Sequence, residues 1–300
     1  MTVARPGRGP EPGAGPQPGA GAGAGQGTQP GPWHGRARGP EPVGALRLPG
    51  AGPLFDFRVR LRPGADAAAG LLATMDAHGI RRAMVTPGGT ATLARISRQF
   101  IKGGGVTEDA DNGAALSVCQ EHHERLVPCY FASPHNPDAY AAEGKDHAAV
   151  EISPAVHGVP LADPRTAALV ETAQHAGHSV YTVCLPLPGS GVADLARLAA
   201  GFPSVTFVMG HCGIGNIDVW GLSLVRDSPN VLVETSGGYT VTLRAALGEL
   251  GADRVLFGSE YPLQDPGVEL AKFAALGLDG ATLARITWEN AHRILGEDVV

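Results

Sequence analysis

Short apolar runs alternate with amphipathic stretches from residue 54 to the end of the chain. Each run is rich in β-branched or aromatic residues and ends at a polar residue or a glycine, which is typical of a buried parallel strand. The runs predicted to be strands are LFDFRVRL (54–61), RAMVTP (82–87), LVPCYFAS (126–133), AAVEIS (148–153), HSVYTVCL (178–185), VTFVMGH (205–211), VLVETSG (231–237) and RVLFGSE (254–260).

The segments between these runs have the end signals of helices. In DPRTAALVETAQHAG, Asp163 is an N-cap candidate, Pro164 suits the first helical position, and Gly177 closes the segment. A strand followed by a helix, repeated eight times, predicts a parallel sheet, and eight strands are enough to close a barrel. We therefore predict an α/β protein with a single (β/α)8 barrel, a TIM barrel.

The N-terminal residues 1–53 have a different composition, roughly half glycine and proline. Glycine loses much conformational entropy on folding and proline removes backbone donors, so this tract cannot build a packed element. We predict a disordered tail at 1–53 and one barrel domain at 54–300. A Pro-rich recognition segment and a mis-assigned start codon remain alternative interpretations of the tail.

Charge and cysteine content narrow the class of protein. The net charge is −6, the pI is near 6.0, and the basic residues are scattered, so nothing indicates nucleic-acid binding. No apolar stretch of about 18 residues is present, so we expect no membrane span. The cysteines form no C-x-x-C pair and suit a reducing cytoplasm, where each is expected to be a small buried hydrophobe; they are Cys119, Cys129, Cys184 and Cys212.

Candidate chemistry lies where the predicted strands end, because the active site of such a barrel is at the carboxyl ends of its strands. We expect a small-molecule substrate to bind there. The polar residues at or near these ends are Arg58, Arg60, Thr86, Ser133, His135, Glu151, Thr182, Cys184, His211, Glu234 and Glu260.

Four motifs in the second half of the chain occur in an order and spacing typical of one family. They are VMGHCGIGN, VLVETSGG, RVLFGSEYP and ITWENAHRILG, and they resemble the C-terminal half of amidohydrolase-related proteins, a group that includes aminocarboxymuconate semialdehyde decarboxylase-like enzymes. FDFRVRL and MDAHGIRRAMVTP match more loosely. The resemblance covers residues 54–297, most strongly from about 203 onward. It implies a hydrolase or a non-oxidative decarboxylase that uses a divalent metal, usually zinc.

The metal ligands that the resemblance implies are largely replaced. An H-x-H pair on the first strand falls on Arg58 and Arg60, the fifth strand lacks its histidine at 182–184, and the aspartate after the eighth strand is Glu260. Only His211, which would support proton transfer, is unchanged. A guanidinium has donors only and cannot coordinate a cation. We therefore expect the usual metal site to be altered or lost, with no cofactor bound there.

Two hypotheses follow for the substituted site. In the first, Arg58 and Arg60 grip a substrate carboxylate, His211 acts as general base or acid, and Glu260 orients an arginine or the substrate. His135 and Glu234 complete the expected substrate-binding set, and Glu234 is expected to meet an arginine of the first strand. In the second hypothesis, the arginines and Glu260 form a structural ion-pair cluster in an inactive barrel that binds a ligand or partner.

A third hypothesis keeps the family chemistry through a displaced zinc ion. His135, Cys184, His211 and Glu260 could approach one another at the barrel mouth and supply suitable ligands. A homodimer stays open as well, because related barrels often dimerise. Trp220 and Trp288 are expected to pack against the barrel.

Overall fold

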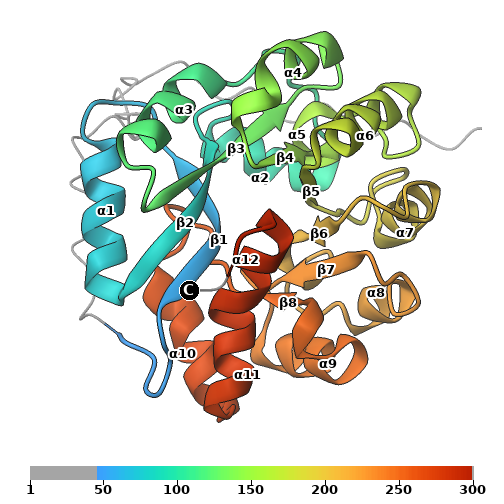
Figure 1. Ribbon diagram of the computed structural model, residues 1–300. Helices are drawn as coiled ribbons and strands as arrows, with labels where there is room; N and C mark the ends of the chain where they lie inside the picture. The colour runs from blue at the N-terminus through green and yellow to red at the C-terminus, as the bar shows by residue number, and fades with distance from the viewer. Residues whose placement is uncertain (1–45, 299–300) are drawn as a thin grey trace, which may run out of the picture. The chain divides into compact units, whose positions relative to one another are not determined.

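The computed structural model describes residues 46–298, which form eight parallel strands surrounded by helices (Figure 1). This confirms the predicted TIM barrel. The strands are β1 Leu54–Leu61, β2 Ile80–Pro87, β3 Leu126–Ala132, β4 Ala149–Ile152, β5 Ser179–Thr182, β6 Phe207–Met209, β7 Val231–Glu234 and β8 Val255–Leu256.

The strands follow one another around the sheet in chain order, and each pairs in parallel with the next. Backbone hydrogen bonds then join β1 to the segment around β8. The Phe57 nitrogen donates to the Phe257 carbonyl at 2.9 Å, and the Arg60 nitrogen donates to the Tyr261 carbonyl at 2.8 Å. These bonds bring the ends of β1 and β8 together, which places the side chains after each strand at one rim.

Helices cover the outside of the strands (Figure 1). In α6 the predicted start and end are confirmed, because the Asp163 side chain accepts from the Arg165 nitrogen and Gly177 has a left-handed φ of 71°. The helices are α1 Ala67–His78, α2 Leu93–Lys102, α3 Asn112–Glu121, α4 Pro137–Glu143, α5 Pro154–His157, α6 Pro164–Ala176, α7 Val192–Gly201, α8 Val219–Leu224, α9 Thr240–Leu250, α10 Pro266–Leu276, α11 Gly280–Ala284 and α12 Asn290–Leu295.

The residues of β1 serve two cores. Phe55 and Phe57 belong to a buried cluster with side chains of the other strands and of α12, whereas Leu54, Val59 and Leu61 belong to a cluster shared with the outer helices. Residues two apart normally share a face, so the change of face between Phe57 and Val59 reflects the register shift of β1 against β2 between Asp56 and Val59. The four cysteines are buried and unpaired, as the sequence predicts.

The two tryptophans behave differently from each other. Trp288 is buried at 9% exposure, which confirms its predicted packing, but Trp220 is 73% exposed, so that prediction is wrong for Trp220. Its helix, α8, buries Gly221 and Leu222 instead. A six-residue helix has only one narrow inward face, and Trp220 lies outside it.

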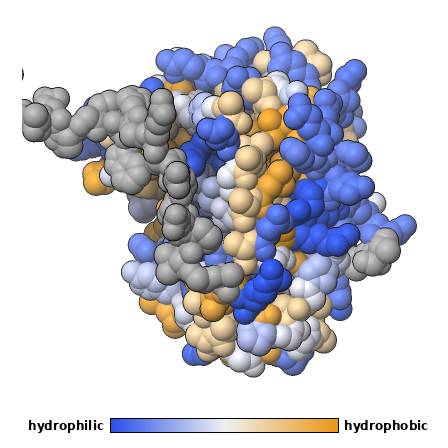
Figure 2. Space-filling model, turned by 90° about the vertical axis from the view of Figure 1, so that its left-hand side faces the viewer, coloured by the Kyte–Doolittle hydropathy of each residue, from blue (hydrophilic) through white to orange (hydrophobic). Residues whose placement is uncertain are grey.

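Figure 2 views the side on which α1 lies, where hydrophilic residues flank a narrow column of apolar ones. Within residues 46–298, no helix is long and apolar enough to cross a membrane.

Most of the predicted tail, residues 1–45, lies outside the described part of the chain. At its end, Leu48 is buried and the Arg47 side chain donates to the Asp76 carbonyl at 3.2 Å.

Candidate active site

A pocket of about 620 Å³, part of it open to solvent, lies at the carboxyl ends of the strands. Its polar base is formed by residues that end or follow β1, β6 and β8, as the barrel predicts. Its walls are mostly apolar. The ionisable residues are Arg58, Arg60, His211 and Glu260, the other polar ones are Thr90, Gln99 and Ser153, and the apolar ones include Ile96, Phe100, Phe131, Val156, Val183 and Leu263.

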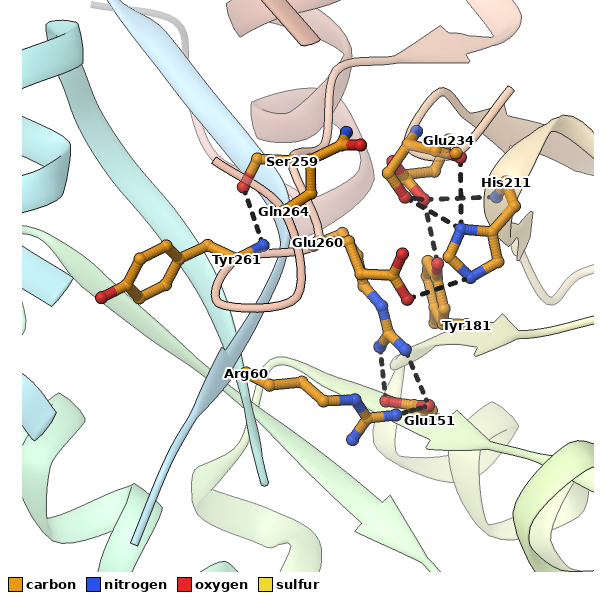
Figure 3. Close-up of polar contacts among 12 residues, drawn as sticks. Arg60, Glu151, Tyr181, His211, Glu234, Ser259, Glu260, Tyr261 and Gln264 are labelled. Atoms are coloured by element: carbon orange, nitrogen blue, oxygen red, sulfur yellow. Dashed lines mark hydrogen bonds and ion pairs between the residues drawn. The ribbon is translucent and has the colours of Figure 1, made fainter. Parts of the chain in front are cut away.

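Two arginines of β1 share one carboxylate at the base of this pocket (Figure 3). Arg58 donates to Glu151 through both terminal nitrogens, at 2.6 and 3.3 Å, and Arg60 donates to it at 2.5 Å. Glu151 belongs to β4, which is not paired with β1 in the sheet. Because alternate residues of a strand share a face, Arg58 and Arg60 point the same way and meet one partner.

Aromatic rings support both guanidinium groups. The Arg58 guanidinium lies 4.4 Å from the centre of the Tyr181 ring, and that of Arg60 lies 4.8 Å from the centre of the Phe131 ring. Arg60 also donates to the Pro87 carbonyl at 3.1 Å. Arg58 is 3% exposed and Arg60 is 17% exposed. Arg60 is therefore the arginine that a ligand in the pocket reaches more easily.

Electrostatics keep Glu151 ionised. Burial alone would raise the pKa of Glu151, but the charges and hydrogen bonds of Arg58 and Arg60 outweigh burial and lower that pKa to about 2. The cluster of Arg58, Arg60 and Glu151 thus contains two cations and one anion at neutral pH. Within these three residues one positive charge is left over, and Glu260, which lines the same pocket, is the next negative charge that acts on both arginines.

His211 and Glu260 form the other polar part of the base. The His211 Nε2 atom lies 3.5 Å from the Glu260 Oε1 atom, and the two side chains are 13% and 22% exposed. Both residues have left-handed backbone conformations, with φ of 60° and 61°. A residue other than glycine adopts this conformation at a cost of about 1–2 kcal/mol. Such strain is often found at functional sites, where the surrounding structure holds it.

The contacts of Nδ1, the other ring nitrogen of His211, show which tautomer the ring adopts (Figure 3). Nδ1 lies 3.2 Å from the Ser236 carbonyl oxygen and 2.9 Å from the Ser236 hydroxyl. That hydroxyl donates to Glu234 at 2.9 Å, so its hydrogen is already in use. Nδ1 therefore carries the proton and donates to Ser236. In the neutral ring, Nε2 then presents a lone pair toward Glu260 and the pocket.

Glu234 is fully buried and organises this side of the pocket. It accepts from the Tyr181 hydroxyl at 2.9 Å, from the Ser236 nitrogen at 2.5 Å and from the His211 nitrogen at 3.4 Å. The sequence predicts that Glu234 meets an arginine of β1. The structure differs, because Glu151 takes both arginines while Glu234 binds the groups that surround His211.

Asp56 holds the turn that carries Glu260. Its carboxyl group accepts from the Ser259 nitrogen at 2.8 Å, from the Ser259 hydroxyl at 2.5 Å and from the Arg58 nitrogen at 3.1 Å. Burial raises the pKa of Asp56 to about 7, against the lowering effect of these hydrogen bonds. Asp56 thus joins β1 to the segment after β8 at the point where both supply pocket residues.

The four residues predicted to hold a displaced zinc ion do not come together. His135 lies outside the pocket lining and places Nε2 3.1 Å from the His157 carbonyl. Cys184 is buried, and burial raises the pKa of its thiol. Across residues 46–298, no three His, Cys, Asp or Glu side chains are grouped so that they could hold a metal ion.

The sequence places Glu151 among the strand-end candidates but does not identify its role, and it does not identify two further contributors to the site. The partner of the two arginines is Glu151, the support of His211 is Ser236, and one wall of the pocket comes from Ile96 and Phe100 of α2. A charged residue inside the apolar run AAVEIS was a usable signal for Glu151, because a buried carboxylate needs a partner. Ile96 and Phe100 are four residues apart and so lie on one face of a helix, which was a weaker signal that α2 supplies an apolar wall.

Comparison with known proteins agrees with the fold and the motifs. A relative, gamma-resorcylate decarboxylase from Polaromonas sp. (strain JS666), is 28% identical over 144 residues, which are 41% of this chain and 40% of that protein. The matched part thus spans about two fifths of the relative's length.

Solved structures with the same fold cover most of the described chain. One is 2,6-dihydroxybenzoate decarboxylase from Rhizobium, with a TM-score of 0.61 and 17% identity over 81% of this chain and 98% of that one. Another is 5-carboxyvanillate decarboxylase from Novosphingobium aromaticivorans, in complex with manganese and a nitrobenzoic acid, with a TM-score of 0.64 and 16% identity over 83% of this chain and 97% of that one.

The family itself is shown by a sequence model described as "Amidohydrolase", which matches residues 55–296 and so almost all of the barrel. The match includes β1 to β8 and the closing helix α12, in the order that the four motifs predict. This chain belongs to the amidohydrolase family.

Proposed function

We propose that this barrel is a non-oxidative decarboxylase of small aromatic carboxylic acids that works without the metal ion of its relatives. The observation that carries the proposal is the arrangement of His211 and Glu260 beside Arg60 around one apolar-walled pocket. Decarboxylation is favoured over hydrolysis because relatives matched by sequence and by structure are named decarboxylases.

The residues at the base of the pocket do not suit a divalent metal ion. Arg58 and Arg60 stand where the family resemblance implies two histidines, and a guanidinium offers no lone pair. At an effective dielectric constant of about 20, each unit positive charge about 5 Å away costs a divalent ion roughly 6–7 kcal/mol. Glu151 compensates only one of the two charges. No step of the proposed reaction therefore involves a metal.

Arg60 is the proposed anchor for the substrate carboxylate. It is more exposed than Arg58, and it is tied to Glu151 through only one of its terminal nitrogens. A guanidinium binds carboxylates through charge-assisted hydrogen bonds. The apolar walls, which include Phe100 and Phe131, suit the flat face of an aromatic ring.

His211 is the proposed proton donor. Its Nε2, 3.5 Å from the Glu260 carboxylate, first takes up a proton from solvent at the open side of the pocket. Nε2 then transfers this proton to the ring carbon that carries the carboxylate. The bond from that carbon to the carboxylate breaks, its electron pair returns to the ring, and carbon dioxide leaves. The product carries hydrogen in place of the carboxylate, and His211 is neutral again.

A second candidate function is ligand binding without turnover. The contacts of Arg58 favour it. Both terminal nitrogens of Arg58 donate to Glu151, so only Arg60 of the two arginines is available to a ligand. This candidate predicts that aromatic acids bind in the pocket but release no carbon dioxide.

Carbon dioxide release from 2,6-dihydroxybenzoate and 5-carboxyvanillate by the full chain, with and without a chelator, tests the proposal. We expect turnover that the chelator leaves unchanged. His211→Asn is expected to lower kcat by roughly a hundred- to ten-thousand-fold, the usual contribution of general acid–base catalysis. His123→Asn, at an exposed position in the same chain, is the matched control.

The outcomes separate the two candidates. Unchanged turnover in folded His211→Asn would contradict the proposed role of His211. Binding of both acids without any carbon dioxide release would favour the second candidate. Turnover that is abolished by the chelator and restored by added manganese would contradict a metal-free centre.

A further inference from the structure

A buried ion pair on α10 lies outside the pocket but close to the support of His211. Glu269 is 1% exposed and Lys272 is 13% exposed, and the Glu269 Oε2 atom lies 2.5 Å from the Lys272 Nζ atom. Neither residue lines the pocket. Burying two charges is expensive and is repaid only when further hydrogen bonds satisfy them. The partners of this pair therefore indicate what it holds in place.

Those partners belong either to the turn after β7 or to the segment just before α10. Lys272 Nζ donates to the Thr235 carbonyl at 2.9 Å and to the Gly238 carbonyl at 2.6 Å. Glu269 accepts from the Gly237 nitrogen at 3.3 Å and from the Gln264 side chain at 2.5 Å. The ion pair thus fixes both ends and the middle of the four-residue turn 235–238, which connects β7 to α9.

The same turn determines how the imidazole of His211 is oriented. Ser236, in the middle of the turn, accepts the hydrogen bond from Nδ1 (Figure 3). Gly237 packs directly on the ring, since a Cβ added there would lie 3.5 Å from Nδ1, and its φ of 70° suits glycine. A shift of the turn would therefore move the Nδ1 acceptor and free the ring to change tautomer.

We propose that Glu269 and Lys272 are positioning residues for His211. Acting through the turn 235–238, they hold the imidazole with its proton on Nδ1 and its lone pair on Nε2, facing the pocket. The importance of this tautomer for turnover rests on the proposed function, but the orientation itself does not. The two can therefore be tested separately.

The test is nitrogen NMR of the His211 ring in the full-length protein, at a pH where the imidazole is neutral. The signal is assigned by its absence from His211→Asn. We expect the unsubstituted protein to show the Nδ1–H tautomer alone, and Lys272→Met and Glu269→Gln to show a mixture of both tautomers. Lys272→Arg, which keeps the charge and the donors, is expected to restore most of the Nδ1–H form. Lys145→Met removes an exposed lysine and is the matched control.

Activity provides a second readout. If the proposed function holds, Lys272→Met lowers kcat by up to about a hundredfold, the effect of a small misplacement of a reacting group, with little change in KM. A single Nδ1–H tautomer in both variants would overturn the positioning role. A tautomer mixture in the variants of a protein that releases no carbon dioxide would leave the positioning role standing and remove the proposed function. Thermal unfolding of each variant shows whether the fold is kept.

Discussion

The two sides of the pocket are built in different ways. On the side of β6, β7 and β8, His211, Ser236, Glu234 and Glu260 come from strand ends that are close together, and the motifs GHCG, ETSG and GSEY contain all of them. On the side of β1 and β4, Arg58 and Arg60 reach a carboxylate that lies 93 and 91 residues away in the chain.

The two sides of the pocket therefore have different roles: one carries groups for proton transfer, and the other carries buried ion pairs. The histidine side offers an ionisable ring with a defined tautomer and a partly exposed carboxylate, which are groups that can move a proton. The arginine side offers permanent cations, one of which is largely neutralised by a buried anion. Changes on the arginine side should therefore affect the stability of the fold first, and changes on the histidine side should affect turnover first.

The largest expected effect on stability comes from Glu151→Gln. Removing the shared anion leaves two cations buried without their partner, which typically costs about 3–5 kcal/mol. Urea unfolding of the variant measures this loss. The control is Glu124→Gln at an exposed position, with an expected change below about 0.5 kcal/mol. A similarly small effect for Glu151→Gln would show that the ion pairs do not stabilise the barrel.

The pH dependence of that loss is the next prediction. The pKa of Glu151 lies at about 2 in the folded protein, below its ordinary value of 4.5. The stabilisation from the ionised carboxylate is therefore complete above about pH 4.5 and is lost as the pH falls toward 2. The difference in unfolding free energy between the unsubstituted protein and Glu151→Gln should narrow over this interval. A difference that stays constant from pH 6 to pH 3 would contradict the assigned pKa shift.

Replacing each of the two arginines by methionine should have different effects, one mainly on ligand binding and the other mainly on stability. Arg60→Met is expected to weaken binding of an aromatic acid by about 1.5–3 kcal/mol, the usual contribution of a hydrogen bond to a charged group. Calorimetry with 2,6-dihydroxybenzoate measures this change. Arg58→Met is expected to destabilise the fold more than Arg60→Met, because Arg58 is the more deeply buried partner of Glu151. The reverse order would show that Arg58 is the anchor.

The smallest expected effect on stability comes from Glu260→Gly. Glycine relieves the left-handed φ of 61° but loses more entropy on folding, so the unfolding free energy should be unchanged or rise by at most about 1 kcal/mol. Turnover should nevertheless fall, because the carboxylate beside His211 is removed. Thermal unfolding and carbon dioxide release measure the two effects. A clear loss of stability would indicate that Glu260 has a structural role.

Much of the fold could be predicted because its signals are local. The apolar runs locate all eight strands, and Asp163 and Gly177 mark the ends of α6. Six of the strands are shorter than their runs, as in β5, which ends at Thr182 although the run continues to Leu185, whereas β1 matches its run and β2 begins two residues earlier. The extra residues leave the sheet at the rim, where backbone groups find other partners. The exposure of Trp220 was missed because a short helix gives little information about its buried face.

The candidate site was only half predictable, for a physical reason. The family resemblance identifies His211 and Glu260, since each lies in a short motif beside its strand. The pairing of Arg58 and Arg60 with Glu151 depends on the diameter of the barrel and on side-chain reach across it, which a single sequence does not encode locally. The sequence accordingly predicts Glu234 and Glu260 as partners of the arginines, whereas the structure pairs both arginines with Glu151.

The metal content of the purified full-length protein shows whether the site with Arg58 and Arg60 can hold a metal ion. The protein would be incubated with excess zinc or manganese, separated from free ions and examined by elemental analysis, with Arg58→His/Arg60→His as the comparison. We expect far less than one metal ion per unsubstituted chain and more in the double variant, because the double variant restores imidazole ligands. About one ion bound per unsubstituted chain would contradict the claim that two arginines and Glu151 replace the metal.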